Sequence, residues 1–107
     1  MKKKTSDKHP DYYEAILQLR PYKEEVYDLV HVLVDKREDV FIAKEKLLKS
    51  GIDLYISSQK FTRHTLGPQL KRKFKGSLTI TKTLYGRHRM SSKLIYRATV
   101  LFRLKEE

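Results

Sequence analysis

The sequence of 107 residues contains no cysteine, three prolines and four glycines. Without cysteine there is no disulfide framework, no thiol nucleophile and no thiolate zinc site. Long apolar runs are also missing, since no stretch approaches the roughly eighteen residues that a membrane-spanning helix requires. This composition suits a reducing compartment, and we expect a soluble, cytoplasmic protein that does not bind membranes.

The second half of the chain has almost no acidic residues, and this absence says more about function than the lack of cysteine does. Between Ser57 and Lys105 there are thirteen lysine or arginine residues and no acidic one, whereas basic and acidic residues balance before Ser57. The net charge of +11 therefore comes from the second half of the chain. A solvated surface normally mixes both signs, and a one-sided run repels itself unless a polyanion lies against it. The pattern predicts a polyanion binder, with RNA as the first candidate.

Catalytic motifs are also absent: there is no P-loop, no G-x-G-x-x-G, no H-E-x-x-H and no nucleophile elbow. The four histidines, at positions 9, 31, 64 and 88, have no metal-ligand spacing, and a structural role is favoured for His31. A metal-free nuclease would need His64 and His88 to meet across the fold beside a lysine. We expect no enzyme activity, cofactor, metal or small-molecule substrate.

Apolar residues make up 39% of the chain, enough for one modest core. Residues 1–10 show no periodicity and are expected to form a flexible basic arm. Residues 11–107 are expected to form a single α+β domain of the RNA-binding kind.

The first part of this domain reads as a strand followed by a helix. Apolar residues alternate at Tyr13, Ala15, Leu17 and Leu19, which predicts a strand. Pro21 is expected at the first helical position, with Glu24 and Glu25 in the first turn. The buried face of this helix is expected to contain Tyr22, Val26, Leu29, Val30 and Leu33.

A hairpin and a second helix follow. Residues 40–48 and 52–56 read as two strands joined by the Ser50-Gly51 turn, and Ser57 or Ser58 is expected to cap the helix. The buried stripe of that helix is expected to contain Thr62, Leu66, Leu70 and Phe74. Gly67-Pro68 interrupts it, which predicts a kink or two short helices.

Two further strands are expected at residues 78–85 and 94–104, joined by a polar, basic loop at residues 86–92. The element order is then β-α-β-β-α-β-β. It predicts an α+β fold in which two helices pack on an antiparallel or mixed sheet.

Three separated segments resemble one known family. They are YYEAILQLR at residues 12–20, GIDLYISSQK at 51–60, and LYGRH at 84–88 followed by YRATVLFRL at 96–104. Together they are similar to the middle region of the large ribosomal subunit export adaptor family, also called nonsense-mediated mRNA decay protein three.

The resemblance implies binding to the large ribosomal subunit, through ribosomal RNA and with ribosomal proteins as possible neighbours. It also implies a fold similar to the L-twenty-two-e type of ribosomal protein. Family members usually begin with a cysteine-rich zinc-binding region, which this sequence lacks. The resemblance therefore implies contact with RNA of the large subunit, in an assembly, stability or adaptor-like role, while the export and decay roles attach to parts not found here.

The second helix supplies the first group of candidate RNA-binding residues. Lysine and arginine contact phosphate with little regard to base sequence. Lys73 lies nearer the buried stripe and is expected to take less part. The alternative is a solvated helix face, although such faces usually carry acidic residues as well. The candidates are Lys60, Arg63, His64, Lys71, Arg72 and Lys75.

The last two strands supply the remaining candidates. The basic loop could grip RNA, or only protect a hairpin tip from aggregation. The strand arginines could extend that surface, or cover the sheet with their aliphatic stems. The loop candidates are Arg87, His88, Arg89 and Lys93, and the strand candidates are Arg97 and Arg103.

Phe61, Tyr85 and Tyr55 are interleaved with this charge and could stack on bases, although such aromatics more often belong to the core. The sequence also leaves open a protein-interaction module that docks on an acidic partner protein.

Overall fold

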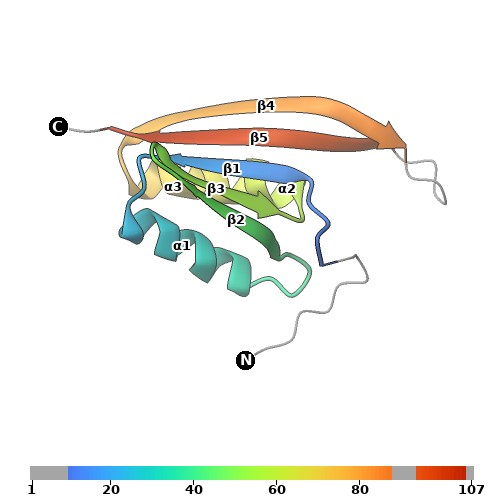
Figure 1. Cartoon of the computed structure of the whole chain (residues 1–107), viewed down its shortest axis with the longest axis horizontal. Helices are drawn as coiled ribbons and strands as arrows, with labels where there is room; N and C mark the ends of the chain where they lie inside the picture. The colour runs from blue at the N-terminus through green and yellow to red at the C-terminus, as the bar shows by residue number, and fades with distance from the viewer. Residues whose placement is uncertain (1–9, 88–93, 106–107) are drawn as a thin grey trace.

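The computed structural model describes residues 10–87 and 94–105 of the chain, and these form a mixed five-stranded sheet with helices on one face (Figure 1). Residues 1–9 of the expected basic arm, which was placed at residues 1–10, lie outside the described residues. The sheet order is β2-β3-β1-β5-β4. The strands are β1 (Ala15–Arg20), β2 (Ile42–Leu48), β3 (Gly51–Ile56), β4 (Gly76–Arg87) and β5 (Leu94–Leu104).

The central strand β1 determines how the sheet is assembled. It pairs antiparallel with β3 on one side and parallel with β5 on the other. The other neighbouring strands pair antiparallel, as hairpins β2–β3 and β4–β5. The α+β class is confirmed, and of the two sheet types expected, the mixed one is present.

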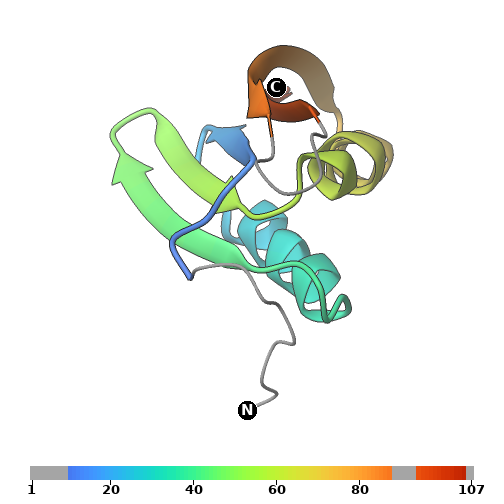
Figure 2. The same cartoon turned by 90° about the vertical axis from the view of Figure 1, so that its right-hand side faces the viewer.

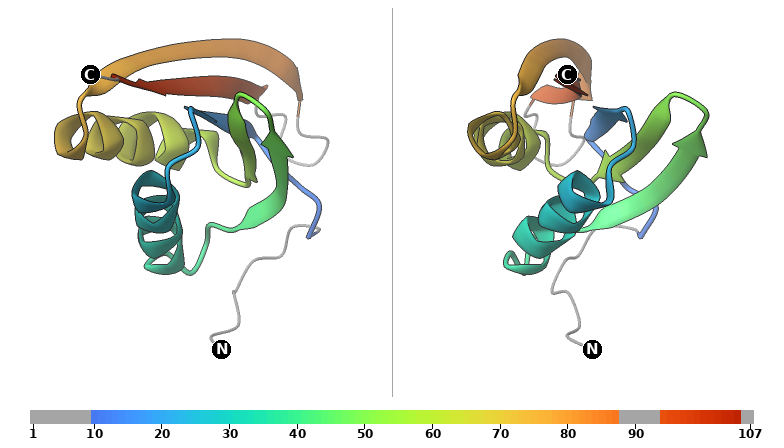
Figure 3. Two further views of the ribbon diagram at one scale, coloured as in Figure 1. Left: turned by 60° about the vertical axis from the view of Figure 1, so that its left-hand side comes forward. Right: turned by 90° about the vertical axis from the view of Figure 1, so that its left-hand side faces the viewer.

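The helices lie on the same side of the sheet (Figures 2 and 3). They are α1 (Glu24–Asp35) and a second helical segment made of α2 (Gln59–Phe61), the π-helical turn η1 (Thr62–Leu66) and α3 (Gly67–Lys73). Alternate residues of β1, β3 and β5 meet these helices in one hydrophobic cluster, which includes Leu17, Leu54, Val100, Val30 and Leu66. No described element covers the opposite face of the sheet.

Helix α1 begins later than the sequence predicted. Lys23 is the N-cap and has an extended backbone (φ −136°, ψ 128°), so Pro21 precedes the helix instead of opening it. The two glutamates do lie in the first turn, as expected. Tyr22 lies outside the helix and is 40% exposed, because the extended Lys23 takes it out of the helical repeat. The buried residues of α1 are Val26, Val30 and Val34, with Leu29 and Leu33 partly buried.

Polar contacts also connect α1 to β2. Glu45 accepts a hydrogen bond from the Tyr27 hydroxyl (2.6 Å), and its other carboxylate oxygen lies 2.8 Å from Nε2 of His31. The hydrogen bond to the Glu45 carboxylate, with some burial, raises the pKa of Tyr27 to about 12. His31 thus has a structural contact, as the sequence suggested.

The second helical segment begins at Ser58, whose Oγ accepts a hydrogen bond from the Phe61 amide (3.1 Å). Its interruption takes the form of a π turn. Pro68 has no amide hydrogen to donate, and the Gly67 amide donates to the Thr62 carbonyl, five residues back. A Cβ on Gly67 would lie 3.2 Å from Leu78, so glycine lets the helix approach the sheet closely. The stripe is confirmed: Thr62, Leu66 and Leu70 are buried and Phe74 partly so.

Gly51 is expected to be essential at the start of β3. A Cβ at this position would lie 2.0 Å from the main-chain oxygen of Leu19 in β1, a clash that only backbone movement can relieve. We expect Gly51→Ala to lower the free energy of unfolding by about 2 kcal/mol or more in chemical denaturation. Gly86→Ala is the control, because a Cβ there would have nothing within 4 Å. Equal stability of the two variants would contradict this account of the β1–β3 contact.

Candidate nucleic-acid interface

The basic side chains of the second helical segment form an exposed surface, which we call the helix surface. Arg63 is half-buried and donates a hydrogen bond to Gln59 Oε1 (2.6 Å). Lys73, which was expected to lie nearer the buried stripe, is exposed. The buried stripe continues through Leu70 and Phe74, so Lys73 projects beside it into solvent. The exposed residues of the helix surface are Lys60, His64, Lys71, Arg72, Lys73 and Lys75.

The basic loop is described only where it leaves the sheet. The main chain of Arg87 pairs with Leu94 at the end of the β4–β5 hairpin. The remaining loop candidates, His88, Arg89 and Lys93, lie outside the described residues, and their predicted role stays a prediction.

Arg97 and Arg103 lie on the sheet face opposite the helices. Ala98, Val100 and Phe102 are buried beneath the helices, so the residues between them in β5 point the other way. The strand arginines and the helix surface are therefore on opposite sides of the sheet, and the predicted cations do not form one flat surface. We call this second side the open face.

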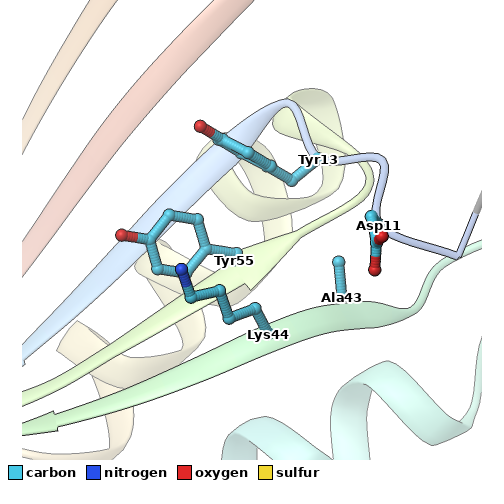
Figure 4. A pocket seen from close by; sticks show the side chains of 5 residues that line it. All are labelled: Asp11, Tyr13, Ala43, Lys44 and Tyr55. Atoms are coloured by element: carbon cyan, nitrogen blue, oxygen red, sulfur yellow. The ribbon is translucent and has the colours of Figure 1, made fainter.

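A row of cationic and aromatic side chains crosses the open face at one end of the sheet. Lys44 Nζ lies 5.2 Å from the centre of the Tyr55 ring, which meets the Tyr13 ring edge to face at 4.9 Å. Figure 4 shows these three residues around a shallow pocket. The Arg97 guanidinium then lies 4.3 Å from the Tyr13 ring centre and 3.7 Å from that of Tyr85.

The order of these residues follows the order of the strands. Lys44 comes from β2, Tyr55 from β3, Tyr13 from the segment just before β1, Arg97 from β5 and Tyr85 from β4. The row therefore reaches from one edge of the sheet to the other. We call it the tyrosine–arginine row.

Arg97 is held between aromatic rings and forms no ion pair with a described residue, although Glu14 lines the same hollow. None of the ion pairs between described residues includes Arg97, and its buried Nε has no hydrogen-bond partner among them. A guanidinium normally uses its several donors, and a buried donor without a partner is uncommon. The charge of Arg97 is thus uncompensated by direct contact.

The backbone around Tyr13 is fixed by its neighbours. The Tyr12 hydroxyl donates to Glu14 Oε2 (2.5 Å), and Glu14 Oε1 accepts from the Gln59 amide (3.0 Å). Burial, followed by the hydrogen bond to Glu14, raises the pKa of Tyr12 well above its ordinary value. These contacts attach the chain before β1 to the start of the second helical segment.

Arg20 and Arg103 are neighbours in the parallel register but differ in role. Arg20 Nη2 lies 2.6 Å from Oδ1 of Asp53, and its Nη1 donates to the carbonyls of Leu19 and Ile52. The side chains of Arg20 and Asp53 are only 14% and 12% exposed. Arg103 is exposed on the strand surface. Arg20 therefore serves the fold, whereas Arg103 is available to a ligand.

The sequence named some of these aromatic residues as candidates and missed Tyr13 and Lys44. Phe61 is 6% exposed and has Arg37 over its ring (5.1 Å), so it packs at the start of the helix and is no stacking surface. Tyr85 is 58% exposed and Tyr55 half-buried. Tyr13 continues the apolar alternation of Ala15, Leu17 and Leu19 but lies before β1, which begins at Ala15, and its ring meets Tyr55 on the open face.

Within residues 10–87 and 94–105, no group of three histidine, aspartate or glutamate side chains could hold a metal ion. No helix in that part of the chain is long and apolar enough to cross a membrane.

Fold and surface together define a small basic α+β domain with a helical layer on one sheet face and a tyrosine–arginine row on the other. The chain belongs to the NMD3 family, because the model of that family described as "NMD3, second domain" matches residues 12–104. This family is associated with the large ribosomal subunit. No curated protein gives a match to the chain. The expected family is therefore confirmed, whereas the similarity to the L-twenty-two-e type of ribosomal protein is not.

The contrast between the two neighbouring arginines can be measured. Arg20→Ala leaves Asp53 without its cation, and we expect it to cost about 3 kcal/mol of unfolding free energy. Arg103→Ala should change that free energy by less than about 0.5 kcal/mol, because its side chain is exposed. Urea denaturation of both variants tests the assignment, and a similar loss in both would show that Arg103 is also structural.

Proposed function

We propose that this chain is a non-catalytic RNA-binding module that binds ribosomal RNA of the large ribosomal subunit. The observation that carries the proposal is the helix surface. All the charged side chains of the second helical segment are basic, and most of them are exposed. Family membership supports the large subunit as the partner, since the family is associated with it.

Electrostatics favours a polyanion over an ordinary protein surface. Lys71, Arg72 and Lys73 follow one another at the end of α3, and Lys75 lies two residues beyond that end. Cations this close together repel one another, and closely spaced phosphates relieve that repulsion while releasing their own counterions. An acidic protein partner could satisfy the same charge, and the experiment below separates it from RNA.

A non-catalytic role fits the positions of the side chains. His64 is exposed on the helix surface and has no described carboxylate partner. We assign the basic residues to binding, because their exposed charges suit contacts with phosphates.

Salt dependence tests the proposal most directly. If about five phosphates of a single-stranded fragment of large-subunit rRNA are contacted, log affinity should fall with log salt concentration at a slope of about −3.5. Fluorescence anisotropy of a labelled fragment at several salt concentrations measures this slope. A flat response, or equal affinity for a polyacidic peptide, would contradict RNA binding.

The helix surface can be tested by removing two of its charges. If both residues contact phosphates, Lys71→Ala with Arg72→Ala should make the slope shallower by about 1.4. The control is Lys36→Ala with Lys49→Ala, two exposed lysines from the charge-balanced half of the chain. Both double variants should keep their thermal midpoints, because all four side chains are exposed. An equal change of slope in the two would mean that the helix surface is not the binding site.

A further inference from the structure

The open face has a chemistry that the helix surface lacks. Three tyrosines, an arginine and a lysine form the tyrosine–arginine row, whereas the helix surface offers charge alone. Charge alone is enough for phosphate, which every nucleic acid presents. A nucleic-acid binding surface gains from aromatic rings only where those rings can reach and stack on bases.

We propose that the open face binds single-stranded RNA, with an unpaired base stacked on the Tyr85 ring and Arg97 directed at the same nucleotide. This inference rests on the proposed function and specifies a second site for it. It makes the domain a two-sided RNA binder, with the backbone held on the helix surface and a base held on the sheet.

Tyr85 has one ring face available for stacking. Arg97 lies 3.7 Å from its ring centre and covers one face, while 58% of the residue remains exposed. Tyr85 belongs to β4, which is the edge strand, so no further strand flanks it. A base could therefore approach from solvent without any movement of the sheet. Base–aromatic stacking is tolerant of sequence, because every base has a flat face.

A small hollow lies beside this pair. It has a volume of about 200 Å³ and lies over β1, β4 and β5, where Glu14, Ile16, Thr81, Thr83 and Thr99 line it together with Arg97. Its size suits one small planar group and is well below the usual volume of a drug-sized ligand pocket. The threonine hydroxyls can donate or accept hydrogen bonds at the edge of such a group.

Charge complementarity identifies the occupant as an anion. Lys46 and Arg103 are exposed on this face in addition to Lys44 of the row. Of the acidic side chains here, Asp53 pairs with Arg20, Glu14 accepts hydrogen bonds from Tyr12 and the Gln59 amide, and Asp11 lines the pocket beside Lys44. Arg97 and Arg103 form no ion pair with a described residue, so their charges are available to an external polyanion.

The occupant must also present free bases. In duplex RNA the base faces are covered by stacking, so a tyrosine can reach only bases that are unpaired. Arginine suits such a site because its planar guanidinium can stack and form hydrogen bonds at the same time. An unpaired RNA segment satisfies both the charge and the rings of the open face.

The experiment compares two oligomers with the same number of phosphates, oligouridylate and its abasic analogue, at fixed salt. We expect the intact chain to bind oligouridylate about 5- to 150-fold more tightly than the abasic strand. Tyr85→Ala should remove this preference without changing affinity for the abasic strand. Tyr85→Phe should retain it. Tyr22→Ala is the matched control, since Tyr22 is an exposed tyrosine outside the row, and it should also retain the preference.

The intact chain gives a second readout that needs no variant. It has seven tyrosines and no tryptophan, so its ultraviolet fluorescence is that of tyrosine alone. After correction for the ultraviolet light that uracil itself absorbs, oligouridylate should quench this fluorescence, and the abasic strand should quench it much less. This measurement keeps the proposal testable if Tyr85→Ala fails to fold.

The outcomes separate the two proposals. Equal, salt-dependent binding of both oligomers would overturn base stacking and leave the proposed RNA binding intact. Binding to neither oligomer at low salt would contradict both. A base preference that survives Tyr85→Ala would also overturn the site proposed here.

Discussion

The pairing of β1 with β5 joins two separate hairpins into one sheet, and the rest of the fold depends on it. Two-stranded hairpins are marginal on their own in water, whereas several strands with a common apolar face can bury a core. The strand β1 bonds to β3 on one side and to β5 on the other. Its buried residues Ala15, Leu17 and Leu19 place all three strands over the same helices. One short strand thus gives the domain a single core.

The same pairing creates the two surfaces of the domain. Because side chains alternate along each strand, burying one face of β1, β3 and β5 leaves the other face without a helical layer. The second helical segment buries its apolar stripe in the core, and its basic side chains face the solvent. Basic residues that the sequence groups together are therefore divided between opposite sides of the sheet. Since α3 contacts β4, the edge strand is where the two surfaces come nearest to each other.

Local patterns anticipated much of the fold because they reflect local physics. The sequence predicted the serine cap and the buried stripe of the second helix, whose residues recur at every fourth position. It also predicted the alternation of buried residues in β3 and β5. Pro21 misled because proline suits both the first turn of a helix and the extended segment before it, and only the backbone at Lys23 decides between them. The place of Tyr13 on the open face was not visible in the sequence, because Tyr13 continues the apolar alternation of β1 but lies before the strand begins at Ala15.

The sequence by itself determined the charge asymmetry, the number and order of the main elements and the family, since these depend on residue identity and short-range spacing. Only the tertiary structure decided which cations share a surface. The members of the tyrosine–arginine row are scattered over more than fifty positions of the chain. They come together only through the strand order β2-β3-β1-β5-β4. That order depends on long-range pairing, and neither composition nor periodicity contains it.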